Sequence, residues 1–345
     1  MSEAETPQPD REGGLAHPRS VHDLFGHAEA EAVMARALES GRMHHAWMIT
    51  GPKGVGKATL AWRLARRALG AAPAGEGLAS DPQDPQCRRL EALSHPDFLL
   101  IRRPFNEKTK KLKGEITVEE ARRAPDFFSR SASGGHYRVA LVDAADELNT
   151  NAANALLKTL EEPPRRGLLI LVVNTPGRLL PTIRSRCRRL SLRAPEPGAT
   201  ADWLARVHGV DPADAERAAA LAAGAPGRAL ALAEIGAPSL KDDIDQALAG
   251  LPSLDRAAAS RLAANAGKKD GEAFKQILMD FLLSYAQERA RTLALGEAGP
   301  ERAGRWVLAA DGLTRLARES ETLYLDPKQT VYAAFALLQD AASAA

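Results

Sequence analysis

Cysteine is scarce in this chain, with only Cys87 and Cys187 among 345 residues. Two thiols far apart in the sequence do not form the dense disulfide framework of a small secreted protein. The N-terminus has no apolar segment of the kind that a signal peptide needs. The chain also has no run of about 18 apolar residues that could cross a membrane. Together these absences predict a protein of the reducing cytoplasm.

An excess of charge of one sign is also missing. The chain has 46 basic and 44 acidic residues, so its formal net charge is +2. Such a balance creates no strong overall field that would attract nucleic acid, and any such contact has to come from local basic patches. The remaining composition, 45% hydrophobic and 26% charged, is ordinary for a globular protein. The length predicts two or three domains.

The first 194 residues of the chain read as a short tail followed by an α/β domain. Residues 1–20 are polar and rich in proline, which predicts a disordered tail. From 21 to 194, short apolar runs alternate with helical patterns, which is the βαβ order of a parallel sheet covered by helices. Continuous apolar runs suit strands that are buried on both faces. The predicted strands are Ala46–Thr50, Val139–Asp143 and Leu168–Asn174, with a further one at Asp97–Arg102.

The remaining residues, 195–345, read as helical. A proline-rich boundary follows residue 194. A short helical module is predicted over 195–237 and a second one over 238–345. The longest helices are predicted at Glu272–Leu295 and Glu301–Glu319. Asp326 followed by Pro327 has the residue types of an N-cap and a first helical position, so the last helix should begin there.

A phosphate-binding loop follows the first predicted strand. Gly51 to Lys57 fits the pattern G-x-x-x-x-G-K, with Gly54 and Gly56 inside it, and a helical pattern over Ala58–Leu69 comes next. The glycines let backbone N–H groups close around phosphate oxygens, and Lys57 can reach the β- and γ-phosphates. A glycine-rich turn with a chance lysine is the alternative. This context favours a P-loop fold.

The loop lacks the hydroxyl that normally completes it. The position after the lysine usually carries Ser or Thr, whose oxygen helps to hold Mg²⁺. Here it is Ala58. Thr59 comes next, but one residue along a helix turns the side chain by about 100°. Thr59 should therefore not replace the missing ligand.

A second acidic motif is also incomplete. Asp143 ends a predicted strand, where a carboxylate would orient Mg²⁺ or its water, although it could simply cap the strand. The next position usually carries the Glu that polarises the attacking water, and here it is Ala144. A positioned general base is worth about 10²–10⁴-fold in rate. We expect negligible ATP hydrolysis by this chain, with ATP or ADP still able to bind through Lys57.

The segment after the strand that ends at Asn174 carries the most specific signal. Ser185-Arg186-Cys187 resembles the SRC motif of clamp-loader subunits of the AAA+ class. The resemblance implies that Arg186 is an arginine finger supplied in trans and that Asn174 is a sensor beside the nucleotide. Gly224 to Leu230 resembles the second sensor, with Arg228 approaching the nucleotide. The alternative is a solvated basic surface, which remains the interpretation for Arg184, Arg188, Arg189 and Arg193.

Other segments resemble the same family or depart from it. Ser94-His95-Pro96-Asp97 and Cys87 match a region that carries four zinc-binding cysteines in many relatives. Asp81 and Asp84 stand at two of those positions. Structural zinc needs four N or S ligands, so we expect no zinc. His44 and His45 are interpreted as structural residues. The basic residues of 102–113 could contact DNA phosphates, although a solvated loop is the simpler interpretation.

The resemblance is to the delta-prime type of subunit in bacterial DNA polymerase III. It implies a RecA-like AAA+ core (21–194), a helical lid (195–237) and a helical collar for oligomerisation (238–345). It also implies a hetero-pentamer with gamma/tau and delta subunits that loads a sliding clamp onto primed DNA. The chain would be a subunit of a polymerase holoenzyme without its own ATPase. The alternatives are an active gamma/tau-type motor, a homohexameric helicase motor and a P-loop nucleotide kinase.

Overall fold

The computed structural model describes residues 15–107, 111–132, 134–268, 271–296 and 300–343. It divides into two compact units, residues 1–230 and residues 231–345, and each is considered by itself. No described helix combines the length and the apolar character that a membrane span requires.

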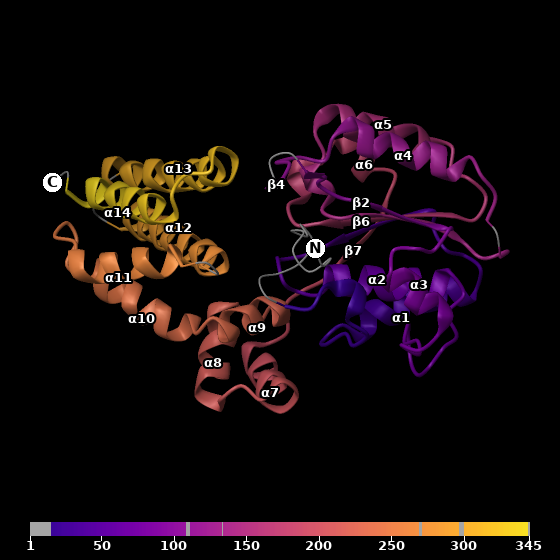
Figure 1. Ribbon diagram of the computed structural model, residues 1–345, viewed down its shortest axis with the longest axis horizontal. Coiled ribbons are helices and arrows are strands. Elements are labelled where there is room, and N and C mark those ends of the chain that lie inside the picture. Colours follow the sequence, from indigo (N-terminus) through magenta and orange to yellow (C-terminus); the bar gives the residue numbers. More distant parts are fainter. Residues whose placement is uncertain (1–14, 108–110, 133, 269–270, 297–299, 344–345) are drawn as a thin grey trace. The chain divides into compact units, whose positions relative to one another are not determined.

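The first unit is built on a five-stranded parallel sheet with the strand order β2-β5-β6-β1-β7 (Figure 1). The predicted strand Ala46–Thr50 is confirmed as β1. The other three predicted strands are confirmed with shifts of about one residue at their ends. They are β2 (Phe98–Ile101), β5 (Arg138–Val142) and β6 (Gly167–Val173), and the edge strand that had not been predicted is β7 (Arg188–Ser191).

Alternating side chains of the sheet build two separate cores, one on each face. In β1, Trp47 and Ile49 join the core formed with α1 (Ala28–Glu39) and α2 (Lys57–Ala68). Ala46 and Met48 join the core on the opposite face, formed with α4 (Val118–Phe128) and α5 (Thr150–Glu161). Because side chains along a strand point alternately to the two faces, a run that is apolar throughout can serve both cores.

The remaining elements of the sheet domain are short. Figure 1 shows α1, α2 and α3 on one side of the sheet and α4 and α5 on the other. The antiparallel pair β3 and β4 lies between β2 and α4 in the chain. The bounds are α3 (Pro85–Glu91), β3 (Phe105–Asn106), β4 (Lys111–Leu112), α4 (Val118–Phe128), α5 (Thr150–Glu161) and α6 (Pro181–Arg184).

Three helices follow β7. They are α7 (Pro197–His208), α8 (Pro212–Leu221) and α9 (Pro226–Glu234). The turn before α9 is held tightly to the end of the sheet domain, because a Cβ on Gly224 would lie 1.9 Å from the Pro195 carbonyl oxygen. The hydroxyl of Thr200 in α7 also donates to the Gly224 carbonyl at 2.8 Å. This turn therefore fixes the start of α9 on the first unit.

The predicted disordered tail ends earlier than expected. Residues 1–14 lie outside the described residues, but the prediction for 15–20 is wrong. Pro18–Ser20 forms a 3₁₀ turn, and the ring of His17 contacts Trp62 edge to face, with 6.0 Å between the ring centroids. The buried guanidinium of Arg66 donates to the carbonyls of Arg19 and Val21. A buried cation needs such acceptors, so α2 orders the segment.

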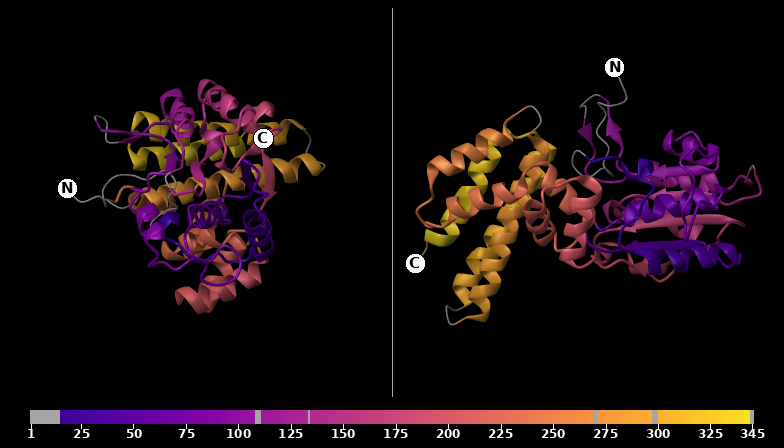
Figure 2. Two further views of the ribbon diagram at one scale, coloured as in Figure 1. Left: turned by 90° about the vertical axis from the view of Figure 1, so that its right-hand side faces the viewer. Right: turned by 90° about the horizontal axis from the view of Figure 1, so that it is seen from below.

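The second unit is helical. Its helices after α9 are α10 (Ala237–Leu248), α11 (Arg256–Ala266), α12 (Glu272–Leu295), α13 (Pro300–Leu323) and α14 (Pro327–Ser343). The two long helices α12 and α13 run side by side in both views of Figure 2. The predicted cap is confirmed, because the carboxylate of Asp326 accepts from Gln329 N at 2.9 Å at the start of α14.

Candidate functional site

The register of the sheet brings the motif residues to one edge. Thr50 at the end of β1 pairs with Val173 at the end of β6, and Val142 at the end of β5 pairs with Leu171. The carboxyl ends of these parallel strands therefore meet at the same edge, where ligands bind in open α/β sheets. The segment Gly51 to Lys57, Asp143 and Asn174 each follow one of these ends.

The glycines of the loop are required by close contacts and by backbone conformation. Gly51, Gly54 and Gly56 have φ values of 151°, 74° and 107°, a region that side chains with a Cβ rarely adopt. A Cβ on Gly51 would lie 2.6 Å from the Leu192 carbonyl oxygen. A Cβ on Gly54 would lie 2.5 Å from the backbone nitrogen of Arg228. The loop therefore packs closely against the residue that follows β7 on one side and against α9 on the other.

The lysine of the loop is directed at the loop itself. Lys57 is buried, and its Nζ donates to the Gly51 carbonyl at 2.8 Å and to the Pro52 carbonyl at 2.7 Å. These two hydrogen bonds use part of the donor capacity of the Lys57 ammonium group without a phosphate. A nucleotide that used Lys57 would have to replace them.

His27 supports the loop and was missed as a site residue in the sequence. It is buried and donates from Nε2 to the Val55 carbonyl at 2.7 Å. Burial lowers the pKa of His27, and the hydrogen bond to Val55 offsets part of that effect. Its ring also lies near Gly56, where an added Cβ would be 3.5 Å from it. The position of His27 directly before α1 was the available signal.

The acidic motif has one buried carboxylate directly after β5 and one with a backbone role. Asp143 follows β5 and is buried. Ala144 carries no polar side chain. Asp146 is directed to the end of β6, where its two oxygens accept from Asn174 N at 2.9 Å and Thr175 N at 3.1 Å. Asp146 therefore holds the predicted sensor segment in place.

The ligand set for Mg²⁺ is incomplete. Ala58 is half-buried and packs against the core that lies over α1 and α2. Thr59 is the next residue of α2 and is also half-buried. Within the described ranges, no group of three or more His, Cys, Asp or Glu residues could hold a metal ion. The loop can offer backbone N–H groups to a phosphate, but the residues around it do not fit a bound Mg²⁺ with a complete protein ligand set.

The start of α9 closes over the loop. Gly227 N donates to the Gly54 carbonyl at 2.8 Å, and Arg228 follows at the contact with Gly54. The structure therefore brings Arg228 to the loop through its backbone.

Arg186 lies at the opposite edge of the sheet from the loop. It precedes β7, whose first residue, Arg188, pairs with Trp47 near the start of β1. Its Nη2 forms an ion pair at 2.9 Å with Glu161, the last residue of α5, and its Nη1 donates to the Thr182 carbonyl at 3.0 Å. The four residues of β7 span roughly 10 Å, at about 3.3 Å per residue. Arg186 is 36% exposed and cannot serve its own loop from this edge.

The other arginines near Arg186 have varied contacts. Arg188 lies over the Trp47 ring at 4.8 Å, and Arg189 donates to Ser191 Oγ at 3.0 Å. Arg184 and Arg193 are exposed. Burial raises the pKa of the Cys187 thiol to about 12, so this thiol stays protonated at neutral pH. Cys187 is therefore a packing residue of the motif.

The region compared with zinc sites is held by ordinary contacts. Asp84 caps α3, with its carboxylate accepting from Gln86 N at 2.7 Å. Cys87 is buried, which raises its pKa, and its thiol donates to Ser80 Oγ at 3.4 Å. The rings of His44 and His45 stack on each other with 4.3 Å between their centroids. Arg103, in the basic segment, pairs with Glu147 at 2.9 Å, and residues 108–110 of that segment lie outside the described residues.

The strand order, the phosphate loop after β1 and the helical module after β7 together define a RecA-like P-loop fold of the AAA+ class. Residues 26–196 match the protein family described as DNA polymerase III, delta subunit.

Curated relatives point in the same direction. The chain is 38% identical over 183 residues to the DNA polymerase III subunit delta' of Pseudomonas aeruginosa, covering 53% of each chain. It is 34% identical over 223 residues to subunit delta' of Escherichia coli, covering 64% of each. It is 31% identical over 191 residues to subunit tau/gamma of Haemophilus influenzae, covering 55% of this chain and 26% of the relative. The matches thus span about half to two thirds of the delta' relatives.

A solved structure is similar over a larger part of the chain. It is a DNA polymerase III gamma subunit-related protein from Thermotoga maritima, with 16% identity and a TM-score of 0.44, covering 90% of this chain and 99% of its own. The fold class stated above rests on the strand order and the loop of this chain.

Proposed function

We propose that this chain is the delta'-like subunit of a bacterial clamp loader, which supports ATP hydrolysis at a neighbouring subunit and performs none itself. In this role it would assemble with gamma/tau and delta subunits in the cytoplasm and help to place a sliding clamp on primed DNA. The helices over 195–237 would form the lid and those over 238–345 the collar of the assembly. The delta' relatives support this assignment.

The observation that carries the proposal is the division of labour between the two edges of the sheet. The edge with the phosphate loop has Ala58 and Ala144 where a hydroxyl and a carboxylate are needed for hydrolysis. The opposite edge carries Arg186, partly exposed and held by Glu161. An arginine offered in trans can raise the rate at another subunit's site by about 10³–10⁵. A subunit with this pair of features can assist hydrolysis but lacks the groups to carry it out.

A hydrolysing gamma/tau-type subunit is the main alternative, because the chain is also similar to a tau/gamma protein. It would need another source for both missing groups. Asp146 is the nearest carboxylate in the motif, and it is bonded to the backbone of Asn174 and Thr175. This contact argues against its use as a base.

Nucleotide binding is proposed without hydrolysis. The loop has the glycines and Lys57 that bind phosphates, and Arg228 follows at the end of the loop contact. Because Lys57 is already bonded to two loop carbonyls, we expect weak binding of ATP or ADP. Isothermal titration with either nucleotide, with and without Mg²⁺, measures this binding. We expect Mg²⁺ to add little affinity, since Ala58 offers no oxygen.

The first test is the ATP turnover of the isolated full chain. We expect turnover far below about 1 s⁻¹, the lower end of the kinase range. A double variant, Ala58→Thr with Ala144→Glu, restores the two missing groups and is the matched comparison. Turnover by the unmodified chain near 1 s⁻¹ would show that the active-motor alternative is correct.

The second test replaces Arg186 in the assembled complex. We expect Arg186→Ala to lower complex-dependent ATP turnover and clamp loading by at least about tenfold, because the arginine acts at a developing negative charge. Arg186→Lys should not restore the rate, since a lysine lacks the planar guanidinium. ATP turnover and the yield of assembled complex are measured on the same preparations.

Two controls separate this effect from folding and assembly. Glu161→Ala removes the partner of Arg186 but leaves the arginine, and an exposed ion pair contributes only about 0–1 kcal/mol. Arg184→Ala makes the same charge change two residues away. Both variants should keep most of the turnover. An unchanged rate in Arg186→Ala, with normal assembly, would exclude the trans role.

A further inference from the structure

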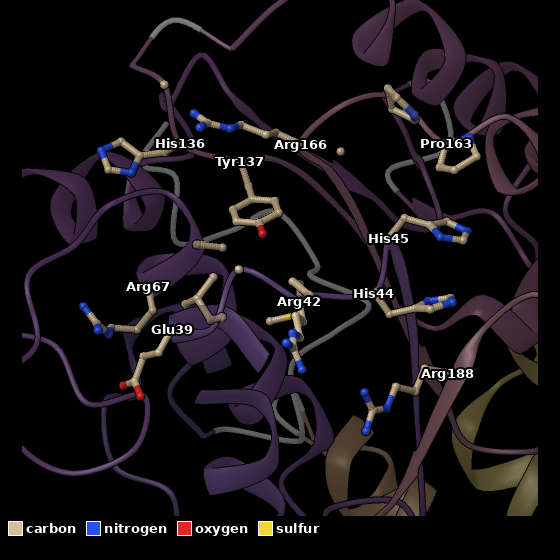
Figure 3. A pocket seen from close by; sticks show the side chains of 17 residues that line it. Glu39, Arg42, His44, His45, Arg67, His136, Tyr137, Pro163, Arg166 and Arg188 are labelled. Atoms are coloured by element: carbon tan, nitrogen blue, oxygen red, sulfur yellow. The ribbon is translucent and has the colours of Figure 1, made fainter. Parts of the chain in front are cut away.

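A basic hollow lies at the amino edge of the sheet, away from the phosphate loop. Its volume is about 940 Å³, and segments that are far apart in the sequence line it (Figure 3). They include the stretch before β1, the end of α2, the start of β5, the turn before β6 and the start of β7. The lining therefore exists only because the parallel sheet gathers the amino ends of its strands.

The charge of the hollow is strongly one-sided. Its lining has four arginines, Arg42, Arg67, Arg166 and Arg188, and Glu39 is the one carboxylate among the lining residues. Arg42 and Arg166 are exposed, and their side chains form no hydrogen bond or ion pair within the part of the chain that the structure describes. Arginines without an acid partner next to a hollow form an anion-binding surface.

Part of this charge has a structural use. Helices α1 and α2 end at the hollow, and a helix C-terminus carries a partial negative charge that favours cations. Arg67 is used in this way, since its Nη1 donates to the Ala71 carbonyl just beyond α2 at 2.6 Å. Arg188 lies over the Trp47 ring at 4.8 Å but remains exposed, so its guanidinium can still contact an anion. Arg42 and Arg166 take part in neither of these contacts, so no structural contact among the described residues accounts for their positive charge.

Flat rings lie among the arginines. His136 is exposed, and its ring covers Gly70, where an added Cβ would lie 2.7 Å from it. In the view of Figure 3 the Tyr137 ring projects between the Arg166 and Arg42 side chains. The stacked pair His44 and His45 lies on the other side of the hollow. Arginines interspersed with rings offer contacts to phosphates and to nucleobases together.

We propose that this hollow binds single-stranded nucleic acid, with Arg42, Arg166 and Arg188 contacting the phosphodiester backbone and His136 stacking on a base. The volume is at the upper end of the range of about 300–1,000 Å³ for small-molecule pockets, so it has room for more than a single phosphate group. A duplex keeps its bases paired and cannot offer them to the rings. This inference does not depend on the clamp-loader proposal.

The test measures binding of a fluorescent oligothymidylate of about 12 nucleotides, a length within the usual range of single-strand sites. The full chain is titrated and the anisotropy is followed from about 50 to 200 mM salt. Three backbone contacts predict a slope of log K against log salt of about −2, at about 0.7 per contact. Arg42→Gln with Arg166→Gln should make the slope shallower by about 1.4 and weaken binding at least roughly tenfold.

Matched variants distinguish the hollow from general charge effects. Arg122→Gln with Arg206→Gln makes the same charge change at exposed positions of the first unit that do not line the hollow, and it should bind like the unmodified chain. His136→Ala should weaken oligonucleotide binding roughly fivefold or more, through the lost stacking. It should leave binding of inorganic polyphosphate unchanged. Thermal unfolding of each variant confirms that it folds.

Several outcomes would overturn the proposal. One is the absence of oligonucleotide binding by the unmodified chain. Another is an unchanged affinity and salt slope in the Arg42 and Arg166 double variant, or an equal loss in the control pair. Equal competition by polyphosphate or by polyglutamate would show a surface that selects only charge. Neither ATP turnover nor the effect of Arg186 enters this measurement, so its failure leaves the proposed function untouched.

Discussion

Gly54 and Gly209 adopt similar left-handed conformations but differ in their surroundings. Their φ values are 74° and 67°. A Cβ on Gly54 would lie 2.5 Å from Arg228 N, whereas a Cβ on Gly209 would meet no atom within 4 Å. At the residue scale, substitutions at these two glycines can be compared. A change at Gly209 alters only the energy of the backbone conformation, whereas a change at Gly54 also alters the contact between the phosphate loop and α9.

We predict that Gly54→Ala destabilises the chain more than Gly209→Ala. The left-handed conformation should cost each variant about 1–2 kcal/mol. Overpacking against Arg228 should add about 1–3 kcal/mol for Gly54→Ala only. Urea unfolding of both variants measures the difference in the free energy of unfolding. Equal values would mean that α9 moves away from the loop without cost.

At the scale of elements, the segment before α1 is held by two arginines of α2 and by Glu91 at the end of α3, which pairs with His22 at 2.6 Å. Residues 15–22 contain no strand or α-helix, yet Arg66 and Arg63 of α2 bind its backbone carbonyls. Arg63 also pairs with Glu31 of α1 at 2.5 Å. Both arginines are buried, and a buried guanidinium is stable only with such acceptors. The segment and α2 therefore stabilise each other.

We predict that Arg66→Met releases this segment. Hydrogen bonds to charged groups contribute about 1.5–3 kcal/mol, so local opening should become at least roughly tenfold more frequent. Limited trypsin digestion followed by mass spectrometry measures the rate of cleavage after Arg19. Arg67→Met is the matched control, because Arg67 lies on the same helix but donates to Ala71. Cleavage after Arg19 at the same rate in all three proteins would contradict the prediction.

At the scale of the whole molecule, the two units differ in their titratable groups. All eight histidines lie in residues 1–230. Burial is the main cause that lowers the pKa of His27, His45 and His95 from the ordinary value of 6.5. A lowered pKa means that the unfolded chain binds protons more readily. The stability that these residues provide is therefore complete above pH 6.5 and is lost as the pH falls through and below that value.

We predict that mild acid destabilises the first unit selectively. Hydrogen exchange at pH 7.5 and 5.5, corrected for the intrinsic rate, should show lost protection in β1 and β5 but not in α12 or α14. His27→Gln removes one of the three groups and should reduce the loss. An equal loss of protection in both units would show that groups other than these histidines control the acid response.

Local signals in the sequence were sufficient to predict many of the strands and helices. Continuous apolar runs predicted β1, β5 and β6, and periodicity predicted α12 with its bounds Glu272–Leu295. Asp326 with Pro327 predicted the start of α14. Strand β7 was missed because its four residues are mostly polar or exposed at the sheet edge, so they carry no apolar run.

The sequence by itself determined the class of fold, the absence of a hydroxyl at position 58 and the absence of a carboxylate at position 144, because these depend on residue type and on spacing along a few neighbouring positions. Only the tertiary structure decided that Arg186 lies at the edge opposite the phosphate loop, that His27 supports this loop, and that distant arginines share one hollow. The physical reason is that strand order and register, which bring distant segments together, are set by the packing of the whole sheet.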